Sequence, residues 1–203
     1  PNVVTVYDQG QDGPLTYLVM DFVAGRTLES AIGEHGALSL PEGLDVAVQL
    51  CAGLAFAHGR QILHRDIKPE NVFLSDEGVV KIGDFGLARV MRELSIQRTE
   101  IRGTPLYMSP EQIRGTDLDF RSDIYALGCT LFSIFTGRPP FVDGEIFYHH
   151  LHTAPPRPSE LVSNLPAELD QAIVACLAKD KEGRPESATA LRERLRPLHA
   201  RFC

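Results

Sequence analysis

The feature that most constrains this chain is a run of eight residues, His64 to Asn71, between a helical pattern and a short run of β-forming residues. Most of its side chains ionise or form hydrogen bonds. Pro69 keeps Lys68 out of the helical conformation, and residues two apart on an extended backbone point to the same side. We therefore expect Asp66 and Lys68 to share one small polar site.

A carboxylate and an ammonium group in one small site have a definite chemistry. The pair can orient a hydroxyl nucleophile and neutralise an anion beside it. Asn71, at the end of the run, offers a neutral oxygen that suits a hard cation such as magnesium. The alternative is a surface loop with an incidental ion pair, and these eight residues alone leave it open.

A second motif, Gly83-Asp84-Phe85-Gly86, places one carboxylate between glycines. A glycine-flanked aspartate is, on its own, more often a turn residue than a metal ligand. Two short β-runs, 72–74 and 79–82, separate the motifs, and a hairpin joining them would bring Asn71 and Asp84 together. Two oxygen ligands then suit a magnesium ion that completes its shell with water and substrate phosphates.

The rest of the chain predicts a hairpin followed by a mostly helical body. β-forming residues on both sides of the turn-rich run 8–14 indicate the hairpin, and Ser39-x-x-Glu42 has the form of a capping box. Little periodicity occurs over 84–111, which predicts a long loop. Apolar residues at helical spacing predict helices at about 41–58, 122–136, 145–150, 166–178 and 187–195.

Composition and charge exclude several classes of function. The 203 residues carry a net charge of −7 and no long basic block, so we expect no nucleic acid partner. The longest apolar run, 126–135, is too short for a spanning helix, so we expect no membrane segment in this chain. Four widely spaced cysteines predict reduced thiols in a cytoplasmic protein, with a membrane anchor outside the chain left open.

Five motifs, taken in order, resemble the protein kinase family. They are HRDIKPEN at 64–71, DFG at 84–86, GTPLYMSPE at 103–111, SDIYALG at 122–128 and KDKEGRP at 179–185. The resemblance covers residues 1 to about 195. Lys68, two residues after Asp66, and Gly103-Thr104-Pro105 are similar to the serine/threonine branch, in the style of bacterial kinases that share the eukaryotic fold.

The resemblance implies an α+β, protein-kinase-like fold. Residues 1–23 would be the last two strands and the hinge of the N-lobe, and residues 24–203 a mostly helical C-lobe with the catalytic loop and activation segment. The implied function is transfer of the ATP γ-phosphate to serine or threonine hydroxyls of protein substrates. Phosphoryl transfer depends chiefly on positioning and charge neutralisation, which suits the polar groups already described.

The same resemblance assigns roles at the site. Asp66 becomes the catalytic base or hydroxyl-orienting group, Lys68 a contact to the transferring phosphate, and Asn71 and Asp84 the Mg²⁺ ligands. The residues implied in ATP binding are Met20, Asp21, Val23, Leu28, Lys68, Glu70, Asn71, Phe73 and Asp84. Met20 is similar to the residue before the hinge, while Leu28 and Phe73 would lie under the adenine ring. Ordinary core packing is the alternative at these apolar positions.

Five further residues would be structural rather than catalytic. Kinases pack the equivalent of His64 against the phenylalanine of DFG, here Phe85. In the family, the equivalent of Asp123 anchors the backbone of the catalytic loop. Glu111 and Arg184 match the buried ion pair that holds the activation segment to the helical lobe, and removing one partner of such a pair typically costs about 3–5 kcal/mol.

Regulation would depend on the loop between DFG and SPE. Arg65 adjoins Asp66, and Arg89 follows the DFG motif, so we expect the two guanidinium groups to converge on one phosphate. Thr99 is the expected phosphorylation site, and Ser95 is the second choice. Glu100 could instead supply a weaker, permanent charge.

Some kinase elements do not occur in these residues. The sequence has no glycine-rich loop, no VAIK-like lysine and no αC glutamate, and it begins at Pro1. We therefore expect a fragment of a longer chain that is inactive alone. A pseudokinase is one alternative, which intact Asp66, Lys68, Asn71 and Asp84 argue against. A small-molecule phosphotransferase is another, and such enzymes generally lack a long activation segment.

Overall fold

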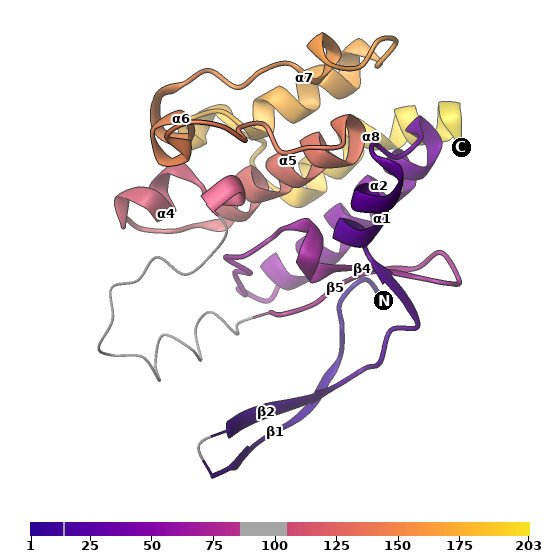
Figure 1. Cartoon of the computed structure of the whole chain (residues 1–203), viewed down its shortest axis with the longest axis vertical. Coiled ribbons are helices and arrows are strands. Elements are labelled where there is room, and N and C mark those ends of the chain that lie inside the picture. The colour runs from indigo at the N-terminus through magenta and orange to yellow at the C-terminus, as the bar shows by residue number, and fades with distance from the viewer. Residues whose placement is uncertain (14, 86–104) are drawn as a thin grey trace.

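The computed structural model describes residues 1–13, 15–85 and 105–203 (Figure 1). A mostly helical body carries two small antiparallel sheets, one of two strands and one of three. This is the α+β architecture that the sequence predicts.

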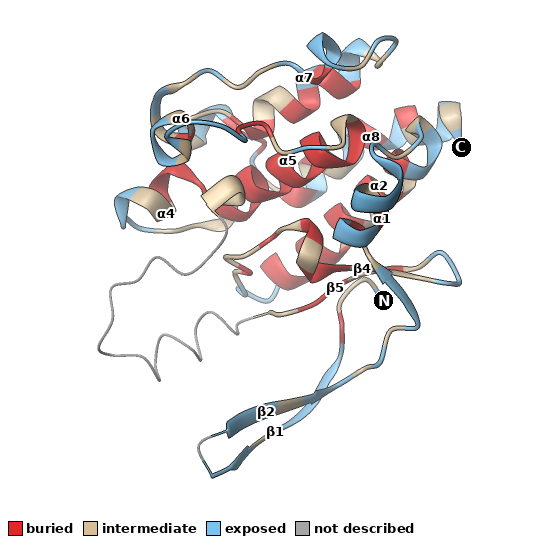
Figure 2. Cartoon of the chain, viewed as in Figure 1, coloured by how far each residue is buried: buried red, intermediate tan, exposed pale blue. Residues whose placement is uncertain are grey.

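The first sheet is the expected hairpin, formed by β1 (Val6–Asp12) and β2 (Leu15–Met20). It projects away from the helical body, and both of its faces are largely exposed (Figures 1 and 2). Backbone hydrogen bonds tie its base to the second sheet, with Val4 N donating to Ile82 O and Ile82 N donating to Asn2 O.

The second sheet has the order β3 (Gly25–Thr27), β4 (Val72–Ser75) and β5 (Val80–Ile82). Its last strand packs on α2 (Leu40–His58). The predicted capping box is present, since Ser39 accepts from the backbone of Glu42 and the Glu42 side chain accepts from the backbone of Ser39. The length and apolarity of α2 would also suit a membrane span, but α2 packs here as a core helix against α5 and α8.

The helix α5 (Phe120–Thr136) forms the centre of the core (Figure 2). Every residue from 122 to 135 is buried, including polar ones. Gly128 lets α7 (Ala167–Cys176) approach closely, because a Cβ there would lie 2.6 Å from Cys176 Cβ. The remaining α-helices of the described residues are α1 (Leu28–His35), α4 (Pro110–Arg114), α6 (Ile146–His152) and α8 (Ala188–Phe202).

Three helices differ from the sequence-based expectations. The sequence did not predict α1, whose signals are the Thr27 N-cap and the Gly36 C-cap. Helix α4 begins inside the expected loop 84–111. Helix α8 runs through Pro197, although a proline usually ends a helix, because Leu198 is buried in the core and His199 pairs with Asp45 of α2.

We predict opposite effects of alanine at two helical glycines. Gly128→Ala forces a Cβ into Cys176 and should destabilise the fold by about 1–3 kcal/mol. Gly33→Ala, on the exposed part of α1 with open space around it, should stabilise by about 0.4–1 kcal/mol. Urea unfolding of both variants measures the two changes, and equal effects would contradict the close packing of α5 on α7.

Candidate active site

The polar run predicted from the sequence lies between α2 and β4, and one buried carboxylate holds its backbone. Asp123 of α5 is 1% exposed and accepts from His64 N at 2.8 Å and from Arg65 N at 2.7 Å. His58 Nε2 contacts the same carboxylate at 2.9 Å. These bonds compensate the burial of the carboxylate and fix the start of the loop.

Asp66, Lys68 and Asn71 lie together. Lys68 has φ −163° and ψ 163°, the extended backbone expected before Pro69, and its Nζ is 3.2 Å from Asp66 Oδ2. Asn71 Nδ2 donates to Asp66 Oδ2 at 3.0 Å and to Asp66 O at 2.8 Å. Because the amide nitrogen is engaged, the orientation of the Asn71 amide is set and its oxygen points elsewhere. The Asp66 side chain is 42% exposed, so a substrate group can reach it.

The β4–β5 ladder places Asn71 and Asp84 at the same end of the sheet. Val72 pairs with Ile82, and Gly83 N donates to Asn71 O at 2.9 Å. An amide oxygen and a carboxylate are the hard oxygen donors that Mg²⁺ prefers, so these residues fit the ion that the resemblance implies. The described residues contain no group of three or more His, Cys, Asp or Glu side chains with metal-binding geometry. A magnesium ion at this place would therefore need phosphate and water oxygens as well.

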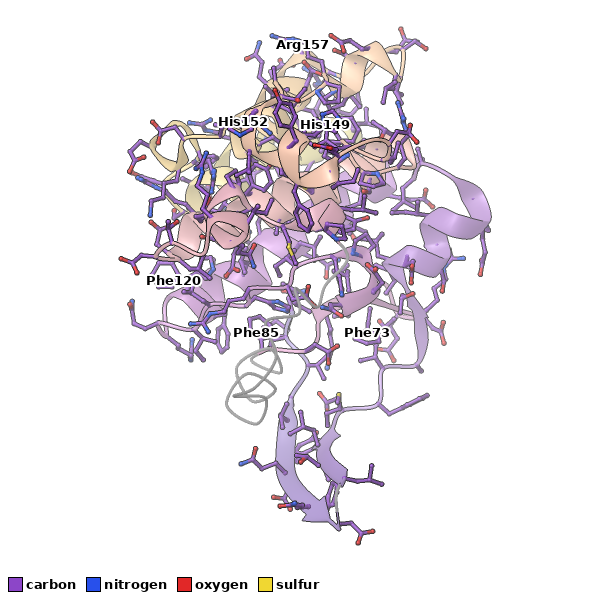
Figure 3. The ribbon with its side chains drawn as sticks, turned by 60° about the vertical axis from the view of Figure 1, so that its left-hand side comes forward. Phe73, Phe85, Phe120, His149, His152 and Arg157 are labelled. Atoms are coloured by element: carbon purple, nitrogen blue, oxygen red, sulfur yellow. The ribbon has the colours of Figure 1, made fainter. Side chains whose placement is uncertain are left out.

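His64 and Phe85 are in contact. Their ring centroids are 4.5 Å apart at an interplanar angle of 66°, and His64 Nε2 contacts Gly83 O at 2.7 Å. His64 is fully buried, and this burial lowers its pKa, which favours the neutral imidazole. Phe85 and Phe73 lie on the side of the body that faces the hairpin (Figure 3).

The residues proposed for nucleotide contact are in different environments. Met20 ends β2 and is partly exposed, while the Asp21 carboxylate accepts from Tyr7 and from Lys81 Nζ at 3.0 Å. The hydrogen bond from Tyr7, followed by that from Lys81, lowers the pKa of Asp21. Phe73 is half-buried on β4, whereas Leu28 has no exposed surface. For Leu28 the structure favours core packing. The remaining two, Val23 and Glu70, are half-buried.

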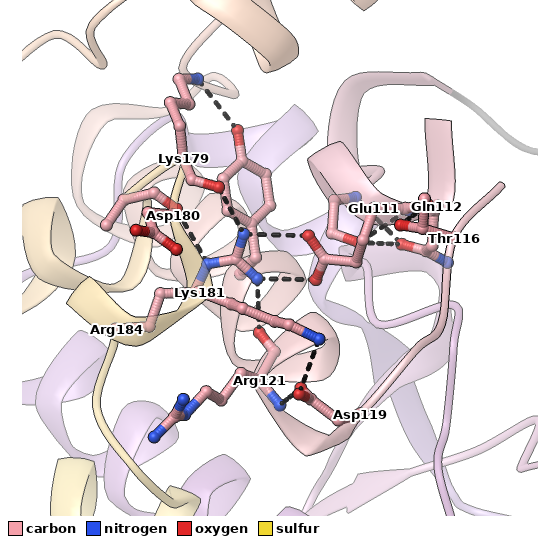
Figure 4. Close-up of polar contacts among 12 residues, drawn as sticks. Glu111, Gln112, Thr116, Asp119, Arg121, Lys179, Asp180, Lys181 and Arg184 are labelled. Atoms are coloured by element: carbon pink, nitrogen blue, oxygen red, sulfur yellow. Dashed lines mark hydrogen bonds and ion pairs between the residues drawn. The ribbon is translucent and has the colours of Figure 1, made fainter. Parts of the chain in front are cut away.

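Glu111 and Arg184, 73 residues apart in the sequence, form a buried bidentate pair at 2.7 and 3.0 Å (Figure 4). Arg184 also donates to backbone carbonyls of Ala178, Lys179 and Arg121. Burial alone would raise the pKa of Glu111, but the hydrogen bonds and charge of Arg184 outweigh it and hold the pKa at about 2. A charged cavity of about 320 Å³ lies beside this pair rather than at Asp66.

A buried polar chain connects α6 with this ion pair, and the sequence reasoning missed it. His150 Nδ1 lies 2.8 Å from the Tyr125 hydroxyl, and Lys179 Nζ donates to the same hydroxyl at 3.3 Å. Burial, with Lys179 nearby, lowers the pKa of His150 to about 4, and burial lowers that of Lys179 to about 8. Asp123 and Tyr125 are two residues apart and so lie on different sides of the helix, and nothing in this spacing indicates their partners.

The sequence also did not predict two contacts that support the polar run, one through Asp123 and one directly. His58 ends α2 and reaches Asp123, and Gln112 reaches the backbone of Arg65. The only local signal for Gln112 is its place three residues after Ser109, which is typical of a capping box.

Only one of the four proposed regulatory residues lies in the described part of the chain. Arg65 has a positive φ of 70°, and its buried Nε has no hydrogen-bond partner among the described residues. Arg89, Ser95 and Thr99 lie outside the described residues.

A comparison with models of protein families and a comparison with curated proteins agree with each other. A sequence model of the protein kinase domain matches residues 1–195. The serine/threonine-protein kinase PknB of Mycobacterium leprae is 37% identical over 209 residues, covering 98% of this chain and 34% of that protein. PknB of Mycobacterium tuberculosis is 38% identical, with 98% and 33% covered. A probable serine/threonine-protein kinase of Clostridium acetobutylicum is 37% identical, with 96% and 30% covered. The chain thus spans about a third of the length of these relatives.

We predict that the Glu111–Arg184 pair gives the fold an acid-sensitive component of stability. Because folding lowers the pKa of Glu111 from about 4.5 to about 2, this component is present above pH 4.5 and is lost as the pH falls towards 2. Glu111→Gln should lower the free energy of unfolding by about 3–5 kcal/mol at pH 7. On acidification, this variant should lose less stability than the unmodified chain. The measurement is the free energy of unfolding from pH 2 to 7.

Glu168→Gln is the control, because Glu168 is exposed and lies 3.9 Å from Arg201. It should change the free energy of unfolding by less than about 1 kcal/mol. Parallel pH curves for Glu111→Gln and the unmodified chain would show that Glu111 does not titrate as described.

Proposed function

This chain belongs to the protein kinase family, and from that premise we propose that it forms most of the catalytic part of a protein serine/threonine kinase. The reaction is transfer of the ATP γ-phosphate to serine or threonine hydroxyls of protein substrates. The observation that carries the proposal is the cluster at Asp66, where Lys68 Nζ and Asn71 Nδ2 lie 3.2 and 3.0 Å from Asp66 Oδ2.

In this proposal Asp66 receives the substrate hydroxyl. Its exposed carboxylate orients the hydroxyl and accepts the proton as the oxygen attacks phosphorus. Lys68, held beside Asp66 by the ion pair at 3.2 Å, is placed to neutralise charge on the transferring phosphate. Asn71 restrains the Asp66 carboxylate through its amide nitrogen.

ATP and Mg²⁺ are the proposed cofactors. The Asn71 amide oxygen and the Asp84 carboxylate would hold the ion, which neutralises phosphate charge when it is bound. Residues 1–23 would serve as the last strands and hinge of an N-lobe, and residues 24–203 as the C-lobe. Met20, Asp21, Val23 and Phe73 would then line the adenine site.

The site and the charge together suggest a kind of partner. A net charge of −7 makes a nucleic acid a poor partner, and an exposed carboxylate at Asp66 suits a hydroxyl presented by a protein. We propose that the catalytic part works in the cytoplasm. The buried Nε of Arg65, which has no hydrogen-bond partner among the described residues, supports the further proposal that a phosphate on Thr99, or on Ser95, binds Arg65 and Arg89.

We predict different losses for two aspartate variants of the whole kinase that contains this chain. Asp66→Asn should lower kcat by roughly 10²–10⁴-fold and leave nucleotide affinity nearly unchanged, because it removes the group that accepts the proton. Asp84→Asn should weaken Mg²⁺-dependent ATP binding by roughly tenfold or more, because it removes an ion ligand. Nucleotide titration and steady-state kinetics separate the two roles.

Asp143→Asn, in the exposed loop before α6, is the matched control and should behave as the unmodified enzyme. If Asp66→Asn lost ATP binding as severely as Asp84→Asn, the two assignments would be wrong. The 203-residue chain alone has no glycine-rich loop, and we expect it to show no kinase activity.

We also predict that the active kinase phosphorylates itself at Thr99. Thr99→Ala should lower activity, because the phosphate that pairs with Arg65 and Arg89 is lost. Mass spectrometry of the active enzyme locates the phosphate, and Ser95→Ala is the comparison variant. An unmodified Thr99 together with a fully active Thr99→Ala enzyme would point to Glu100 as the permanent charge.

A further inference from the structure

Gln112 connects α4 to the polar run that contains Asp66. Its Nε2 donates to Arg65 O at 2.7 Å. Its Oε1 accepts from Ser109 N at 2.9 Å and from Ser109 Oγ at 3.0 Å. A backbone N–H can only donate, so the Ser109 contact requires the amide oxygen on that side and leaves the nitrogen facing Arg65. The orientation of the Gln112 amide is therefore set by its partners.

Gln112 acts on a backbone position that needs support. Arg65 has a φ of 70°, the left-handed region that a non-glycine residue seldom adopts. Its N–H is bound by Asp123 at 2.7 Å, and its C=O is bound by Gln112. The two bonds thus hold both the N–H and the C=O of Arg65, and the next residue in the chain is Asp66. The N–H of the same Arg65–Asp66 peptide donates to His64 Nδ1 at 3.2 Å, so Gln112 and His64 hold this peptide plane from its two sides.

The type of residue at position 112 supports a specific role. A capping box accepts Glu or Gln at the third helical position, because either side chain can accept from the N-cap backbone. Only Gln can also donate to Arg65 O. A glutamate would place a carboxylate oxygen against that carbonyl oxygen, and the two would repel. The capping box alone does not require an amide here, but the contact with Arg65 does.

We propose that Gln112 is a positioning residue that holds the Arg65–Asp66 peptide plane, and through it the Asp66 carboxylate, in the direction needed for phosphoryl transfer. This inference rests on the proposed kinase function. Gln112 lies beside Glu111, whose pair with Arg184 fixes α4 in the body (Figure 4). Helix α4 thus gives Gln112 a rigid base from which to hold the loop.

The test compares three variants of the whole kinase that contains this chain. Gln112→Glu keeps the capping box but loses the donor, and kcat should fall by roughly tenfold or more while KM for ATP stays constant. Ser109→Ala weakens the cap but keeps the donor, so the unfolding temperature should fall while kcat stays within about twofold. Gln171→Glu, on the exposed face of α7, is the charge-matched control and should change neither kcat nor the unfolding temperature.

A second measurement on the 203-residue chain does not depend on activity. Loss of the donor should shift the carbonyl ¹³C resonance of Arg65 and the amide resonances of Asp66 in Gln112→Glu and in Gln112→Met. Gln171→Glu should leave these resonances in place. Gln112→Met has no charge, so it also separates loss of the donor from repulsion and serves if Gln112→Glu folds poorly.

The outcomes are distinguishable from failure of the proposed function. An unmodified kinase without activity would contradict the kinase proposal, while the resonances still test the hydrogen bond. An active kinase whose kcat is unchanged in both Gln112 variants would overturn the inference. Unchanged Arg65 and Asp66 resonances in the two variants would overturn it as well. A loss of kcat in Ser109→Ala equal to that in Gln112→Glu would assign the effect to the cap instead.

Discussion

The candidate site depends on the hydrogen bonds that the buried carboxylate of Asp123 accepts. It accepts from the backbone of His64 and Arg65 and contacts His58, so it joins the end of α2, the polar run and α5. Without this acceptor, one buried and one part-buried N–H group would lose their partner, and the buried one alone would cost about 1–3 kcal/mol. The position of Asp66 follows from this anchor, because Asp66 is the residue after the second of the two N–H donors.

The core of the body explains how such an anchor is tolerated. Helix α5 is buried from 122 to 135, and its polar residues Asp123 and Tyr125 meet partners on other elements, whereas Thr130 bonds to Ala126 O within the helix. Arg184 donates to Arg121 O at the start of α5 while it pairs with Glu111 of α4. Two of the buried carboxylates, Asp123 and Glu111, therefore fix α4, α5 and the polar run relative to one another. Helices α2 and α7 pack their apolar residues against α5, and α8 packs on α2 and α7.

Local signals in the sequence predicted much of this arrangement. The capping box at Ser39 predicted the start of α2, and Pro69 predicted the extended Lys68 that lies against Asp66. Non-local contacts were beyond the reach of these signals. Helix α8 passes Pro197 because its far end packs on α2, and Gln112 binds Arg65 across 47 residues. Such partners depend on how whole helices pack, which a short pattern does not encode.

Backbone strain at the site has a physical consequence for how the fold distributes its stability. Two of the described non-glycine residues with positive φ, Arg65 and Asp84, lie at the polar run and at the end of β5. Each such residue costs of order 1–3 kcal/mol and persists only where its surroundings impose it. The positive φ of Arg65 is imposed by its hydrogen bonds with Asp123 and Gln112. Asp84 follows Gly83, whose N–H is bound to Asn71 O. The directions of the Asp66 and Asp84 carboxylates thus depend on hydrogen bonds from neighbouring elements, so a weakened support changes the geometry of the site before it unfolds the core.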